Sequence, residues 1–109
     1  MPRGEFLGEF EQLVLLAVAR LGEGAYGMSI LDELRARADT EPAVASIYAA
    51  LDRLERQGLV RSSLGQPTSE RGGRAKRFYA LEPSGALALE RTRSRLAALW
   101  DGLDMSAGT

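Results

Sequence analysis

The sequence lacks the two residue types that most often build reactive or metal-binding sites, because it contains no cysteine and no histidine. Their absence excludes disulfides, thiol chemistry, Cys/His zinc sites and histidine-based acid–base catalysis. Aspartates and glutamates are present, but no nucleophile is accompanied by a base in a recognisable arrangement. We therefore expect a protein that is not an enzyme and that holds no metal and no cofactor.

Long apolar segments are also missing. The longest apolar run, residues 13–19, is much shorter than the ~20 residues that a bilayer-spanning helix needs. The N-terminal segment lacks the hydrophobic core of a signal peptide. With 109 residues, of which 45% are hydrophobic, the chain is sufficient for one globular domain with a modest core. We expect a cytoplasmic protein that does not bind membranes.

Charge of one sign does not dominate, since the net charge is −1. The distribution is uneven, however: residues 53–77 hold seven basic and two acidic side chains, so this segment carries +5 and the rest of the chain −6. A basic segment on an acidic body can form a docking surface for the phosphate backbone of a nucleic acid. An ordinary solvated run of charges is the alternative that composition alone leaves open.

What the sequence does contain is an amphipathic stretch, residues 43–60, around which the rest of the chain is organised. Ile47, Leu51 and Leu54 recur at four- and three-residue steps and predict a helix, which Gly58 ends by adopting a positive φ. Small residues in its N-terminal half let such a helix enter a DNA major groove without steric conflict, so we interpret it as a recognition helix. Its remaining faces carry Ala45, Ser46, Ala49, Asp52, Arg53 and Arg56, with Tyr48 beside the apolar stripe.

The segments around this helix predict a winged helix-turn-helix, a fold that is mainly α with a small β-hairpin. Helices are expected at residues 8–21 and 26–38, a turn at 39–42, and strands at 59–64 and 76–81. Residues 65–75 are rich in glycine and polar residues and predict the loop of the hairpin, or wing. The wing brings cations towards the sugar–phosphate backbone, namely Arg71, Arg74, Lys76 and Arg77.

A last helix is expected from Pro83 to about Leu103. Its apolar seam is imperfect and too short for an independent coiled coil, so it needs a cover. A second copy of the chain is the expected cover, through a two-fold contact, and folding back onto its own core is the alternative. Residues 1–81 then form the winged helix and residues 82–109 the dimerisation helix and tail of one compact unit. The expected interface residues are Leu89, Leu96, Leu99, Trp100 and Leu103.

Several short motifs are distributed over nearly the whole chain. They are Ala25-Tyr26-Gly27 with Ile30 and Leu34, Ser46-Ile47-Tyr48 with Leu51, Arg53-Leu54-Glu55, Gly58-Leu59-Val60, Gly73-Arg74 with Lys76, Arg77 and Tyr79, and Leu81-Glu82-Pro83-Ser84-Gly85. Together they resemble the PadR family of bacterial transcriptional regulators. The resemblance implies a homodimeric winged-helix repressor that binds double-stranded DNA at a pseudo-palindromic operator and dimerises through its C-terminal helix.

The resemblance implies a role for Tyr48, and side-chain chemistry suggests roles for other residues of the recognition helix. Tyr48 is expected to hydrogen-bond a DNA phosphate, although a half-buried core tyrosine is the alternative. Ser46, Ala45 and Ala49 are expected to approach the bases, with the alanines contacting thymine methyl groups. Arg53 is expected to bind a phosphate or a partner on its own helix rather than a base.

Two residues depart from the family pattern, both at helix starts. Ala43 stands where the family usually has serine or a similar cap, and Glu82 where it commonly has threonine. We therefore expect two helices that begin without a side-chain cap, at a cost of ~1 kcal/mol for the helix that follows Ala43. Neither departure touches the wing or the dimerisation seam.

Trp100 raises the question of a ligand. In some small PadR-type regulators the dimer interface forms a cavity for flat apolar molecules, and the resemblance places Trp100 on the corresponding helix, with Phe10 facing the same region. A small apolar effector is therefore a candidate partner, and plain packing of Trp100 is the alternative. For the whole protein, the alternative function is a winged-helix module that binds another protein and never DNA.

Overall fold

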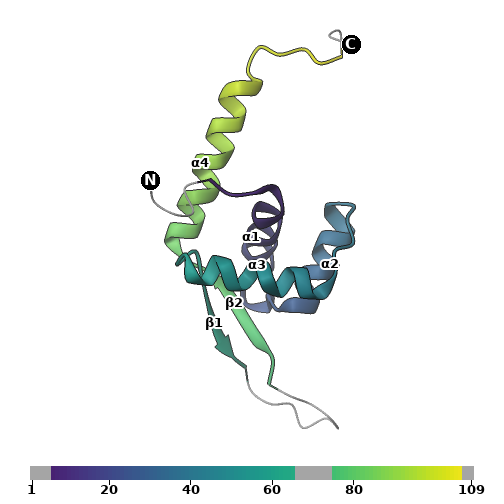
Figure 1. The fold of residues 1–109 in the computed structure, drawn as a ribbon, viewed down its shortest axis with the longest axis vertical. Helices are drawn as coiled ribbons and strands as arrows, with labels where there is room; N and C mark the ends of the chain where they lie inside the picture. The colour runs from purple at the N-terminus through teal and green to yellow at the C-terminus, as the bar shows by residue number, and fades with distance from the viewer. Residues whose placement is uncertain (1–5, 66–74, 107–109) are drawn as a thin grey trace.

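Four α-helices and one antiparallel hairpin make up the part of the chain that the computed structural model describes, residues 6–65 and 75–106 (Figure 1). This arrangement confirms the predicted winged-helix fold class. In chain order the elements are α1 (Glu9–Leu21), the short 3-10 helix η1 (Gly22–Gly24), α2 (Gly27–Arg37), α3 (Val44–Arg56), β1 (Val60–Leu64), β2 (Arg77–Leu81) and α4 (Pro83–Trp100).

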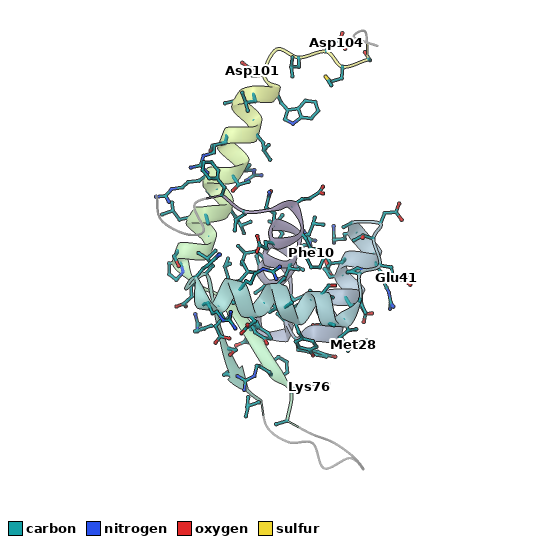
Figure 2. All side chains as sticks on the ribbon, viewed as in Figure 1. Phe10, Met28, Glu41, Lys76, Asp101 and Asp104 are labelled. Atoms are coloured by element: carbon teal, nitrogen blue, oxygen red, sulfur yellow. The ribbon has the colours of Figure 1, made fainter. Side chains whose placement is uncertain are left out.

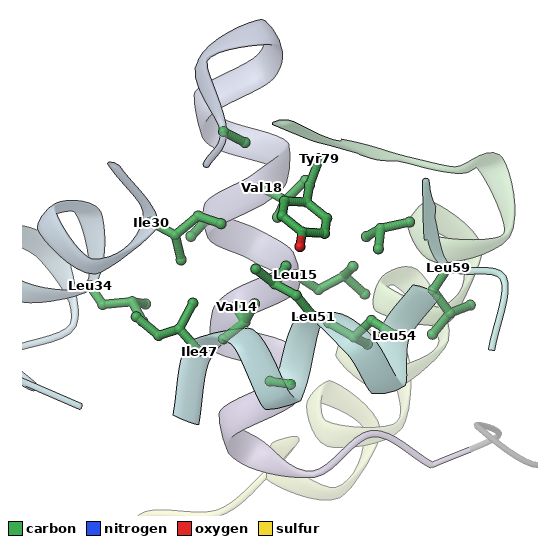
Figure 3. Packing of buried hydrophobic residues seen from close by; sticks show 14 of the residues in the cluster. Val14, Leu15, Val18, Ile30, Leu34, Ile47, Leu51, Leu54, Leu59 and Tyr79 are labelled. Atoms are coloured by element: carbon green, nitrogen blue, oxygen red, sulfur yellow. The ribbon is translucent and has the colours of Figure 1, made fainter. Parts of the chain in front are cut away.

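The hydrophobic core lies between α1, α2, α3 and one face of the hairpin (Figure 3). Tyr79 of β2 is the one aromatic residue among the buried side chains of the described residues. Burying a leucine or isoleucine side chain completely contributes ~1.5–3 kcal/mol, so the helical stripes read from the sequence are also the main source of stability. The largest side chains with no exposed surface are Leu15, Ile30, Ile47, Leu51, Leu54 and Val14.

The ends of α3 differ in how well their backbone groups are satisfied. Ala43 is the N-cap and makes no side-chain capping bond, as predicted. At the other end Gly58, with φ +77°, donates its N–H to the Glu55 carbonyl (2.9 Å), and Leu59 donates to the Leu54 carbonyl (2.9 Å). This pair of bonds is the Schellman motif, and it directs the chain from α3 into β1.

The hairpin is tied to the helices at its root. β1 and β2 pair with Val60 opposite Leu81 and Leu64 opposite Arg77. The backbone N–H of Tyr79 donates to the Ala25 carbonyl (2.8 Å), which joins β2 to the loop before α2. The strand β2 therefore keeps a defined position relative to the helix-turn-helix, since it is bonded to that unit.

The start of α4 packs closely on the end of α3 and the start of β1. Ser84 Oγ donates to the Gly58 carbonyl (2.6 Å), and the N–H of Glu82 donates to the Leu59 carbonyl (2.9 Å). A Cβ atom added to Gly85 would collide with the Leu59 carbonyl oxygen, so glycine is what permits this approach. The N-cap Glu82 makes no side-chain capping bond, as predicted.

The end of α4 corrects the predicted boundary. The helix stops at Trp100 rather than near Leu103. Gly102 adopts φ +82°, and the N–H of Leu103 donates to the Trp100 carbonyl (2.9 Å) in a turn. The apolar spacing of Leu103 suggested a longer helix, but the positive φ of the glycine before it reverses the chain.

The rest of α4 projects away from the helical core (Figure 1). The radius of gyration is 16.1 Å, and the principal extents are 57 × 31 × 20 Å. A compact domain of about 100 residues has a radius of gyration of ~13 Å, so the chain is elongated by this helix. Within the described residues, no helix is both long enough and apolar enough to cross a membrane.

Candidate nucleic-acid interface

The outward face of α3 consists of small side chains in its first two turns. The helix directs four apolar residues into the core, and its period places Ala45 and Ala49 on the opposite side. Both alanines are exposed, and Asp52 and Arg56 continue the same line towards the C-terminus. Ser46 is exposed on one flank of this line. A helix with such a narrow face can approach the floor of a major groove closely.

Tyr48 lies on the other flank and reaches the start of α2. A Cβ atom at Gly27 would collide with the Tyr48 hydroxyl and ring, so the two motifs that contain these residues meet in space. The Tyr48 side chain nevertheless remains 44% exposed. It is therefore half-buried, with the hydroxyl end of its ring against Gly27 of α2. Sequence reasoning missed Gly27 as part of this site, although its place in a short turn motif was a signal.

An aromatic and cationic cluster forms the root of the wing. The Lys76 ammonium lies 4.4 Å from the centre of the Tyr26 ring, and Tyr26 meets Phe78 edge-on at 5.5 Å. Phe78 also covers Gly65, where a Cβ atom would approach its ring to 2.6 Å. Lys76 is held by these contacts below α3, on the hairpin side of the helical core (Figure 2). The cluster fixes a positive charge beside the helix-turn-helix.

The two arginines of α3 are engaged by carboxylates. Arg53 Nε lies 2.9 Å from Glu11 Oε2 of α1, so its partner lies across the core and not on its own helix. Glu11 also accepts the backbone N–H of Gly8 through Oε1 (3.2 Å). Arg56 pairs with Asp52 one turn away (2.6 Å). Sequence reasoning did not single out Glu11, because nothing local links residues so far apart.

The hairpin carries the cations that remain. Arg61 pairs with Glu82, whereas Arg77 donates to Ser62 Oγ (3.0 Å), which in turn donates to Glu55 (2.8 Å). Among the described residues of segment 53–77, Lys76 and Arg77 are the cations with no carboxylate within 4.0 Å. The predicted wing contacts Arg71 and Arg74 lie outside the described residues. The local positive charge is therefore concentrated on the wing side of α3.

Tyr79 contributes packing and no charge. Burial raises the pKa of its hydroxyl, and the nearby Arg77 offsets part of this increase. The group therefore stays protonated at neutral pH. Tyr79 supports the wing from inside the core, as its 6% exposure indicates.

The predicted dimerisation residues divide into two groups. Leu89 packs against the core of its own chain, whereas Leu96, Leu99 and Trp100 are 48%, 75% and 58% exposed. Leu103 is also exposed, in the turn after α4. Three exposed apolar residues at helical spacing form a stripe, here called the α4 stripe (Leu96, Leu99 and Trp100), which the described residues leave open.

The two predicted ligand residues lie on different elements of the chain. Phe10 packs against the core from α1, and Trp100 ends α4. A cavity of about 510 Å³ lies between the end of α1 and the hairpin, lined by Val18, Glu23 and Phe78 among others. Neither Phe10 nor Trp100 lines it. Within the described residues, no group of three acidic side chains is placed to hold a metal ion.

Comparison with known proteins shows which family and which solved structures the chain is similar to. The model of the transcriptional regulator PadR-like family matches residues 15–91. A PadR family transcription regulator from Clostridium difficile R20291 is 25% identical, with 84% of this chain and 91% of that chain covered and a TM-score of 0.70. A PadR family transcriptional regulator from Eggerthella lenta is 27% identical, with coverages of 86% and 81% and a TM-score of 0.67.

A third solved structure includes DNA. Bacillus subtilis PadR in complex with operator DNA is 19% identical, with 81% of this chain and 46% of that chain covered and a TM-score of 0.62. At this identity the likeness concerns the fold. Among curated proteins, none matches the sequence.

Proposed function

Because the chain belongs to the PadR-like family of transcriptional regulators, we propose that it is a homodimeric, cytoplasmic repressor that binds a pseudo-palindromic operator. Members of this family are transcriptional regulators and not enzymes. The solved complex of Bacillus subtilis PadR with operator DNA supports the choice of double-stranded DNA as the ligand. The dimer and the residues in contact are argued from the geometry of this chain, and the repressor role from its resemblance to the PadR family.

One observation carries the proposal: the small face of α3 is exposed, and the neighbouring hairpin carries two cations with no carboxylate partner among the described residues, Lys76 and Arg77. In the proposed complex, Ala45 and Ala49 enter the major groove together with Ser46. The Tyr48 hydroxyl, which lies against Gly27 at the start of α2, donates a hydrogen bond to a phosphate, and Lys76 and Arg77 contact the adjacent backbone. Arg71 and Arg74, which lie outside the described residues, are proposed as further phosphate contacts. Arg53 contributes only if it leaves Glu11, so it is the weakest of the predicted contacts.

The dimer in this proposal forms through the α4 stripe. Exposed leucines and a tryptophan are costly for a single soluble chain, and a second copy covers them by two-fold symmetry. Leu103 extends the contact beyond the helix, and Leu89 supports α4 from the core side. The two recognition helices then reach successive major grooves about 34 Å apart.

An effector completes the proposal. A flat apolar molecule bound between the two α4 helices would contact Trp100 and approach Phe10. Such a ligand changes the angle between the two winged helices and hence the spacing of their recognition helices. Quenching of the fluorescence of Trp100, the one tryptophan of the chain, measures this binding directly.

The test combines duplex binding with a salt titration. Fluorescence anisotropy with a random-sequence duplex should show binding at low ionic strength that weakens as salt increases. The double variant Arg71→Ala/Arg74→Ala should bind every sequence more weakly and should reduce the slope of log K against log salt by about 0.9 for each phosphate that is no longer neutralised. A matched control, Arg93→Ala on α4, should leave the slope unchanged.

Two results would overturn the proposal. A chain that sediments as a monomer at working concentration would remove the dimer. A dimer that ignores duplex DNA even in dilute buffer would favour the protein-interaction module instead.

A further inference from the structure

The line of α3 that faces away from the core offers methyl groups and no hydrogen-bonding group over its first two turns. Ala45 and Ala49 are exposed and lie one turn apart on this line. Val44, at the first helical position, lies on the flank of this line one turn before Tyr48; it is 36% exposed and adds a branched apolar surface there. A polar side chain returns only with Asp52, and its carboxylate is paired with Arg56 at 2.6 Å.

The polar side chains near this line are held to its sides. Tyr48 leans on Gly27 of α2 along one flank, and Arg53 is drawn towards Glu11 of α1 on the other. Ser46 is the exception, because it is exposed on a flank and its hydroxyl forms no hydrogen bond with another described residue. The line of α3 that faces away from the core is therefore apolar over its first two turns, because the polar side chains nearby lie on its flanks.

The four base pairs present different groups to such a surface in the major groove. Guanine, cytosine and adenine expose donors and acceptors there, and only thymine exposes a methyl group, at C5. An alanine against a donor or acceptor removes its water and replaces no hydrogen bond, which is unfavourable. An alanine against a methyl group buries apolar surface on both partners, which is favourable.

On the basis of the proposed DNA-binding function, we propose that α3 recognises its operator half-site chiefly through thymine C5 methyl groups that pack against Ala45, Ala49 and Val44. Val44 then acts as a residue that determines specificity. The same geometry makes binding depend on whether a pyrimidine carries a methyl group at C5, for thymine and cytosine alike. Uracil, which lacks this methyl group, is a poorer ligand than thymine, and 5-methylcytosine, which has it, is a better ligand than cytosine.

The experiment starts with duplexes selected from a random library by the purified full-length chain. In a selected duplex, each thymine of the half-sites is replaced in turn by uracil, which removes one methyl group and keeps base pairing. Removal of each contacted methyl group should lower affinity by about three- to fivefold, the value expected for the burial of one methyl group. Uracil at thymines outside the half-sites is the matched control and should leave affinity unchanged.

A second series tests the methyl group apart from the base. At the sensitive positions, the duplex with 5-methylcytosine should bind about three- to fivefold more tightly than the duplex with cytosine. The variants Val44→Ala and Ala49→Gly should each lose sensitivity to uracil at one position while keeping it elsewhere. Such a double-mutant cycle reports direct contact even if a variant is less stable.

The outcomes separate this inference from the function on which it rests. If no duplex is selected, the proposed DNA-binding function is wrong. If duplexes are selected but uracil binds as well as thymine at every position, the function stands and recognition by methyl groups is wrong. Equal sensitivity to uracil in the wild type and in both variants would likewise remove Val44 and Ala49 from the contact.

Discussion

The inner face of α3 and the outer half of α4 are both rows of apolar residues at helical spacing, yet their surroundings are opposite. Leu51 and Leu54 have no exposed surface, whereas Leu99 is 75% exposed. The first row is enclosed by α1, α2 and the hairpin of the same chain (Figure 3). The second row extends beyond the domain, where no other described element of the chain reaches it (Figure 1).

This contrast separates residues that maintain the fold from residues that await a partner. A buried leucine contributes its burial energy in every molecule, whether or not a second chain is present. An exposed leucine of the α4 stripe contributes nothing until its surface is covered. Identical apolar patterns in a sequence can therefore serve stability in one helix and assembly in another.

The largest effect is expected from truncating a buried leucine. Leu51→Ala should lower the free energy of unfolding by about 2–5 kcal/mol, because it removes buried methyl groups and leaves a cavity. Urea unfolding followed by circular dichroism measures the change. Leu99→Ala is the matched control, and in dilute protein it should change the unfolding free energy by less than about 0.5 kcal/mol. Equal decreases in the two variants would mean that the two rows do not differ.

A smaller decrease is expected where the two regions join. Gly85→Ala places a methyl group against the Leu59 carbonyl oxygen, which belongs to the backbone and has little room to move. Overpacking of this kind costs about 1–3 kcal/mol. Ala86→Gly, at the exposed neighbouring position, is the control for helix propensity and should cost about 1 kcal/mol. A Gly85→Ala protein as stable as the wild type would show that α4 is not anchored at this point.

The α4 stripe itself should respond through association. Trp100→Glu places a charge on the proposed interface, so the dissociation constant of the dimer should rise at least about tenfold, as for removal of an interface hot spot. Analytical ultracentrifugation over a concentration series gives this constant. Glu90→Gln, on an exposed part of the same helix, serves as the control. An unchanged constant for Trp100→Glu would assign the stripe to something other than a second copy.

The same contrast explains which features the sequence could predict. Ile47, Leu51 and Leu54 repeat within a few residues, and Gly58 follows directly, so periodicity and turn chemistry are enough to place α3 and its end. The predicted end of α4 lies three residues too far along the chain, because the spacing of Leu103 continues the seam and outweighs the signal of Gly102.

Contacts between distant parts of the chain could not be predicted from the sequence. The Tyr48 hydroxyl over Gly27 and the Arg53 ion pair with Glu11 join helices whose relative angles depend on the whole core. The hydrophobic periodicity of a single helix does not determine the angles between helices. The sequence thus identified the residues exposed on α3 but not which of them are held aside, and this second fact decides how the helix can read DNA.

The smallest effect concerns one of these restraints. Glu11→Gln keeps an oxygen for the Gly8 N–H and removes the charge that holds Arg53. Because Arg53 is about half exposed, the pair contributes less than about 1 kcal/mol, and the unfolding free energy should change little. The released guanidinium then adds a cation to the face of α3, so binding to random duplex should strengthen at low salt and the salt slope should steepen by up to about 0.9. Arg53→Gln in the same background should restore the original slope. A slope that Glu11→Gln leaves unchanged would place Arg53 out of reach of the phosphates in either state, and the recognition helix would then act through its alanines, Tyr48 and the wing alone.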